Sequence, residues 1–78
     1  MEEMAVLRTV EEDNEWLQRN FGKIQEQHPN EFVAVSEGQV IADGESSGAV
    51  MKEVEQKGMN PATILIEFIP EKGLILIL

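Results

Sequence analysis

Two β-hairpin patterns, each preceded by a helical pattern, constrain the fold of this chain more than any other feature. The first hairpin pattern spans residues 31–43, where a β-rich run is followed by Glu37 and Gly38, a pair typical of a tight turn. The second spans residues 64–78. Because short hairpin connections join neighbouring antiparallel strands, the sequence predicts four strands in two pairs.

The first helical pattern begins after a short N-terminal segment. Thr9 and Glu12 have the spacing of a capping box, in which each side chain bonds the backbone amide of the other residue. Apolar residues then recur at helical spacing as far as Pro29, which ends the helix. Residues 1–8 are expected to form an irregular turn or to be disordered, so that a single domain spans residues 9–78.

The second helical pattern follows the first hairpin. Ser46 or Ser47 can cap its first turn, and Val50 and Val54 lie on its apolar side. Gly58 stands where a helix commonly ends in the left-handed conformation. The sequence therefore predicts a second helix that returns the chain between the two hairpins.

Two sheet arrangements are compatible with this order of elements. The third strand can pair antiparallel with the first, which gives the order 2-1-3-4, or it can lie beside the second strand as a right-handed parallel crossover. We expect the first arrangement. The predicted fold class is α+β with the order αββαββ, a four-stranded and mostly antiparallel sheet, and two helices on one face.

The last predicted strand is apolar on both faces. Residues 74–78 alternate leucine and isoleucine, whereas a strand with one solvated face alternates apolar and polar residues. Two helices on one face would leave the other face of this strand exposed, and a second copy of the chain would bury it. The predicted homodimer interface is therefore Leu74, Ile75, Leu76, Ile77 and Leu78.

The charge of the chain argues against nucleic acid and anionic membranes as partners. Fifteen acidic residues outnumber six basic ones, for a formal net charge of −9. The bases are scattered, whereas a surface that follows phosphates needs clustered Lys and Arg. No apolar run approaches the roughly 18 residues of a membrane span, and the first residues are acidic where a signal peptide would be basic. The expected location is the cytoplasm.

Residue types also exclude several kinds of stabilising site. The chain has no cysteine and a single histidine, His28, which leaves no disulfide, thiolate or His-rich metal site. A domain of 78 residues has a marginal core, and small domains often need a disulfide, a metal or a partner chain. Self-association remains open, and no metal or other cofactor is predicted.

A serine-hydrolase motif is matched literally at residues 44–48, which read Gly-Glu-Ser-Ser-Gly. A serine nucleophile needs a positioned base, but His28 precedes the motif and a hydrolase sheet does not fit in this length. Ser46 is better explained as a helix cap. We predict no catalytic residues. Backbone amides at this helix start would also attract an anion, but Asp43 and Glu45 would repel it.

Two non-catalytic functions remain. The first is a protein-interaction module, a homodimer that also binds another protein, and it follows from the excess apolar strand surface. The second is a small-ligand or metabolite-binding domain, with Trp16, Asp43 and Ser46 as the candidate ligand site. A pocket lined by these three residues would favour the ligand, and a flat apolar sheet face would favour the protein partner.

Four short segments resemble a known family. They are Trp-Leu at residues 16–17, His-Pro-Asn-Glu-Phe-Val-Ala-Val at 28–35, Gly-Gln-Val-Ile-Ala at 38–42, and Phe-Ile-Pro-Glu at 68–71. Over residues 14–78 the chain resembles the prokaryotic domain of unknown function 5678. It departs from the family pattern at residues 28–31, where Tyr-Pro-Gly-Lys is expected. The resemblance implies a stand-alone prokaryotic domain with no assigned activity and no catalytic residues to transfer.

Overall fold

The computed structural model describes the backbone of residues 2–72 and the side chains of residues 8–72. The elements are α1 (Glu2–Arg19), α2 (Phe21–Gln27), β1 (Glu31–Ser36), β2 (Gln39–Gly44), α3 (Ser47–Gln56), the short 3-10 helix η1 (Pro61–Thr63) and β3 (Leu65–Ile69). The predicted fourth strand and interface, residues 74–78, lie outside the described residues.

The described strands form one antiparallel sheet in the order β2-β1-β3. In β1, Ala34 lies opposite Ala42 of β2 on one side and opposite Ile66 of β3 on the other. The third strand therefore pairs antiparallel with the first, as expected, and the alternative parallel crossover is absent from the described sheet. The fold is a mixture of helices and antiparallel strands, with β1 at its centre.

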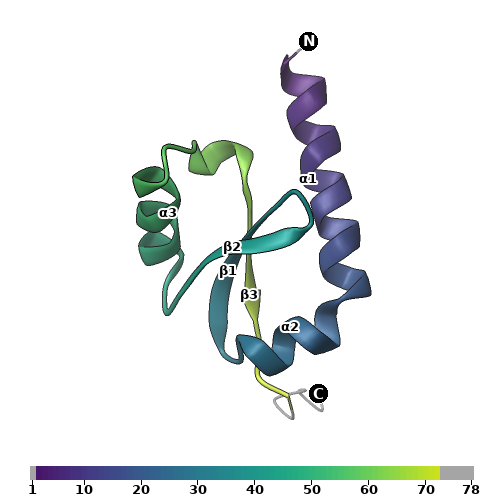
Figure 1. The fold of residues 1–78 in the computed structure, drawn as a ribbon, viewed down its shortest axis with the longest axis vertical. Helices are drawn as coiled ribbons and strands as arrows, with labels where there is room; N and C mark the ends of the chain where they lie inside the picture. Colours follow the sequence, from purple (N-terminus) through teal and green to yellow (C-terminus); the bar gives the residue numbers. More distant parts are fainter. Residues whose placement is uncertain (1, 73–78) are drawn as a thin grey trace, which may run out of the picture.

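The helices cover opposite faces of this sheet (Figure 1), so the prediction of two helices on one face is wrong. On the face of α1 and α2, the buried cluster comprises Leu17, Ile24, Val33, Val35 and Ile69. On the face of α3, it comprises Ala34, Ala42, Val50 and Val54. Since consecutive apolar residues of a strand point to opposite faces, the run at residues 33–35 requires cover on both sides.

The first helical segment differs from its prediction at both ends. α1 begins at Glu2, so Thr9 lies inside the helix and the predicted capping box does not mark its start. The helix ends at Arg19, and α2 leaves in a new direction after Asn20 (Figure 1). The side-chain amide of Asn20 donates to the carbonyl oxygen of Trp16 over 2.8 Å. Asparagine commonly interrupts helices through local bonds of this kind.

The predicted hairpin turn, the Ser46 cap and the left-handed residue Gly58 are confirmed. Glu37 and Gly38 have φ of 52° and 69°, which is the pair of positive values that a two-residue type I′ hairpin turn requires. Ser46 is the N-cap of α3, where its hydroxyl oxygen accepts a hydrogen bond from the Ala49 amide over 3.1 Å. Gly58 follows the helix with a φ of 79°.

Candidate functional site: an open pocket between α2 and β2

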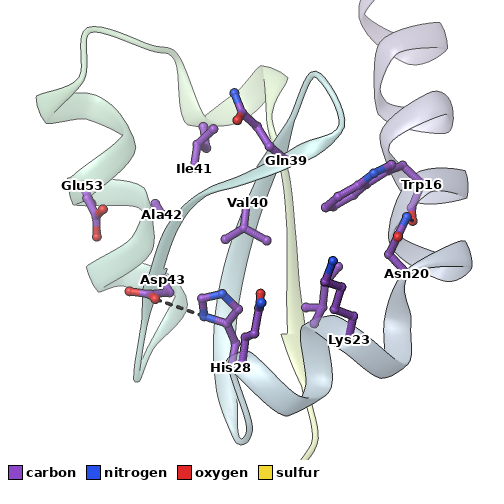
Figure 2. Close-up of a pocket in the computed structure, with 12 residues that line it drawn as sticks. Trp16, Asn20, Lys23, His28, Gln39, Val40, Ile41, Ala42, Asp43 and Glu53 are labelled. Carbon is purple, nitrogen blue, oxygen red and sulfur yellow. Dashed lines mark hydrogen bonds and ion pairs between the residues drawn. The ribbon is translucent and has the colours of Figure 1, made fainter.

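A pocket of about 460 Å³ lies where α1 and α2 face the edge strand β2 (Figure 2). Its lining comprises Trp16, Asn20, Lys23, Ile24, Gln27, His28, Gln39, Val40, Ile41, Ala42, Asp43 and Glu53. This volume falls in the range of about 300–1,000 Å³ that is usual for small-molecule sites. The lining mixes apolar and charged side chains from four elements, and no single segment of the sequence forms it.

The helical wall of the pocket carries an indole ring and an ammonium group. Trp16 lies on α1 and Lys23 on α2, and Figure 2 shows both side chains on the same side of the hollow. The indole also supports the hairpin turn, because a Cβ at Gly38 would lie 3.6 Å from the Cδ1 atom of Trp16. The ring is therefore held in place on one side and lines the pocket on the other.

The wall of the pocket that β2 forms depends on a β-bulge in this strand. Val40 lies opposite Val35, and Ala42 lies opposite Ala34, so that Ile41 is an extra residue in β2. In a regular strand, residues three apart point to opposite faces. The bulge reverses this alternation, and Val40 and Asp43 both lie on the face of α1 and α2. Bulges that reorient side chains in this way are common beside functional sites.

At the lower end of the pocket, as drawn in Figure 2, His28 meets the carboxylate of Asp43. The carboxylate of Glu31, which the figure does not draw, lies beside the same ring nitrogen. The Nδ1 atom of His28 lies 3.1 Å from an Asp43 carboxylate oxygen and 3.6 Å from a Glu31 carboxylate oxygen. The separations suit ion pairs of a protonated imidazole. However, the Nδ1 atom is buried and makes no hydrogen bond with correct geometry to any described residue. His28 is 17% exposed, whereas Asp43 is 47% exposed and open to solvent.

The structure brings only two of the three residues of the predicted ligand site to the pocket. Trp16 and Asp43 line the pocket, and Ser46 does not. The Ser46 hydroxyl caps α3 instead, so the Gly-Glu-Ser-Ser-Gly segment has the role of a helix start. The sequence does not indicate Lys23, Gln39 and Glu53 as pocket residues. Their side chains converge only because of the turn at Asn20 and the bulge in β2.

Across the described residues, no helix combines the length and the apolar character needed to cross a bilayer.

A short antiparallel sheet covered by helices on both faces, with an open pocket of mixed apolar and polar lining, defines this molecule as a small mixed α/β domain with a candidate ligand site. A family model matches residues 23–72, which are 50 of the 78 residues. The chain therefore belongs to the Family of unknown function (DUF5678), as its resemblance suggested. The matched region runs from α2 to beyond β3 and leaves out Trp16 and Asn20. Neither the curated proteins nor the solved structures include a match.

Proposed function

We propose that this domain is a small-ligand-binding protein and that the pocket between α2 and β2 is its binding site. The observation that supports this proposal is the composition of the pocket wall. An aromatic ring, an ammonium group and carboxylates surround one open volume of about 460 Å³. Binding sites for small molecules commonly combine an apolar wall with a few polar groups that fix the orientation of the ligand.

Several polar groups of the pocket have unused hydrogen-bonding capacity. Within the described part of the chain, the side chains of Lys23, Gln27 and Gln39 have no hydrogen-bond or ion-pair partner. The same holds for the indole N–H of Trp16. Such groups are solvated in the free protein and can bind a ligand without first breaking an internal bond.

The positions of the charges indicate the kind of ligand. Lys23 lies on the helical wall, whereas Asp43 and Glu53 lie on the opposite side (Figure 2). A small zwitterion could direct its anionic group toward Lys23 and its cationic group toward the carboxylates, with its apolar part against Trp16. Free amino acids and related zwitterions are therefore the first class to test.

Trp16 is the only tryptophan in the chain, and it provides a direct signal. We expect one class of zwitterion to change Trp16 fluorescence in a saturable way and to raise the melting temperature, since a ligand of the native state stabilises it. Lys23→Ala should weaken that binding by about tenfold or more. Lys52→Ala is the matched control, because Lys52 is exposed on α3 and outside the pocket. Equal binding to both variants would contradict the proposal.

A second proposal is a non-catalytic interaction module that forms a homodimer and binds a further protein. The observation in its favour is the outer edge of β3, which pairs only with β1 among the described strands. β3 also carries Phe68, which is 42% exposed. The ring of Phe68 packs against Phe32 with 5.1 Å between centroids. Free strand edges beside apolar side chains favour pairing with another chain.

A further inference from the structure

We infer that His28, Glu31 and Asp43 form a binding site for a divalent transition metal, with Zn²⁺ as the best-suited ion. The three side chains each offer one ligand atom, and these atoms all lie within 4.8 Å of one another. His28 is the C-cap of α2, Glu31 is the first residue of β1, and Asp43 lies in the C-terminal half of β2. This inference shares Asp43 with the proposed organic-ligand site, but its test uses the metal alone.

The spacing of the ligand atoms fits a single small ion. Zinc binds imidazole nitrogen and carboxylate oxygen at about 2.0–2.1 Å, so that two ligands at a tetrahedral angle lie about 3.3 Å apart. The His28 Nδ1 atom is 3.1 Å from Asp43 Oδ2 and 3.6 Å from Glu31 Oε1. These two separations bracket the tetrahedral value.

The kinds of donor atom select the class of metal. One imidazole and two carboxylates suit zinc and its first-row neighbours, whereas Ca²⁺ and Mg²⁺ prefer shells made of oxygen alone. Three protein ligands also leave a fourth position for water or another group, as in open zinc sites. His28 and Asp43 line the pocket, so the open position would face it.

The environment of His28 gives independent support. The Nδ1 atom is buried and has no hydrogen-bond partner among the described residues, although two carboxylates stand beside it. A buried polar atom without a partner is destabilising, and a metal ion would satisfy it. The formal charge of −9 also favours the approach of a cation to this molecule.

The backbone holds the three ligands in fixed positions. The His28 amide closes the last turn of α2 by donating to the Ile24 carbonyl over 2.8 Å. Asn30, with a φ of 62°, then reverses the chain into β1, where Glu31 pairs with Ile69. Asp43 is held opposite Val33 in the β1–β2 ladder. A site supported by paired strands on two sides needs little reorganisation to bind an ion.

Metal titration of the tag-free, chelator-treated protein tests this inference. We expect isothermal titration calorimetry to show one Zn²⁺ per chain, and Co²⁺ to give the visible absorption of a tetrahedral complex. His28→Gln and Asp43→Asn should each weaken Zn²⁺ binding by more than about tenfold. Glu45→Gln is the matched control, since Glu45 is an exposed acid two residues from Asp43 and outside the cluster.

Two results would overturn the inference. One is no Zn²⁺ binding by the folded wild-type protein, which would leave the cluster as a histidine between two carboxylates. The other is Zn²⁺ binding that His28→Gln leaves unchanged, which would assign the ion to surface acids. Circular dichroism should verify that each variant is folded. Because no organic ligand is present, either result would leave the proposed ligand-binding function standing.

Discussion

The carboxylate of Asp13 in α1 accepts a hydrogen bond from the backbone amide of Gly38 at the tip of the β1–β2 hairpin, with 3.2 Å between Oδ1 and N. Asp13 is only 5% exposed. Trp16, one turn further along α1, lies against the same glycine. This pair of contacts fixes α1 to the hairpin tip. It thereby sets the position of the indole wall of the pocket.

Replacing Asp13 should destabilise the fold through this contact. We expect Asp13→Ala to lower the free energy of unfolding by about 1.5–3 kcal/mol, because the Gly38 amide loses a charged acceptor. Asp13→Asn, which retains an acceptor oxygen, should have a smaller effect. Urea denaturation measures both. Glu12→Ala is the control at an exposed neighbouring position, with an expected change within about 0.5 kcal/mol. An Asp13→Ala effect as small as that of the control would contradict the prediction.

Gly44 and Gly22 should respond in opposite directions to substitution by alanine. A Cβ at Gly44 would lie 3.3 Å from both the Ala49 Cβ and the Val50 Cγ2 atoms, whereas a Cβ at Gly22 would meet nothing within 4 Å. We expect Gly44→Ala to destabilise by about 1–3 kcal/mol through overpacking. Gly22→Ala should stabilise α2 by up to about 1 kcal/mol. Thermal unfolding measures both effects. A loss of stability in Gly22→Ala would show that helix propensity at residue 22 does not limit the stability of α2.

Ser46 should behave as a helix cap and not as a nucleophile. Ser46→Ala should lower the free energy of unfolding by about 0.5–2 kcal/mol, because the Ala49 amide loses its acceptor, and Ser46→Asp should restore most of it. A serine-reactive fluorophosphonate probe should leave the wild-type protein unlabelled. Stoichiometric labelling at Ser46 would contradict the assignment.

The homodimer proposal predicts the mass of the particle in solution. Sedimentation equilibrium at micromolar concentration should give a dimer that tightens as salt rises, since salt screens the repulsion between two chains of formal charge −9. Ile77→Glu or Leu76→Glu, whichever lies on the partner face, should dissociate the dimer or unfold the protein. Met51→Glu is the control, because Met51 is an exposed apolar residue on α3 outside the predicted interface. A single species at 8.8 kDa in the wild-type protein would rule the dimer out.

Local chemistry in the sequence was sufficient to predict the features that depend on neighbouring residues. The turn at Glu37 and Gly38 follows from the two positive φ values that a short hairpin needs. The cap at Ser46 follows from the unsatisfied amides of a helix start. The prediction of two helices on one face is wrong because the continuous apolar run of β1 needs cover on both faces.

Of the pocket lining, the sequence predicts only Trp16 and Asp43, because the geometry of the site depends on register and on helix direction. Nothing in the residue type of Ile41 distinguishes a bulge from a regular strand position, and yet the bulge brings Asp43 to the face of His28. Likewise, the polar residue Asn20 is an ordinary member of a helical pattern until its side chain bonds the preceding turn. The sequence pattern therefore predicts β1, β2, α3 and β3, and not the break between α1 and α2 or the way in which the side chains converge.

The central position of β1 in the sheet protects its backbone amides from exchange with solvent. Its amides can exchange with solvent only if the strand separates from β2 or β3, and Val33, Ala34 and Val35 are fully buried between two layers of helix. Deuterium uptake by β1 should therefore be the slowest in the chain and should follow the global unfolding equilibrium. Opening of either helical layer alone would leave these amides protected, so α3 should exchange faster than the strand that it covers.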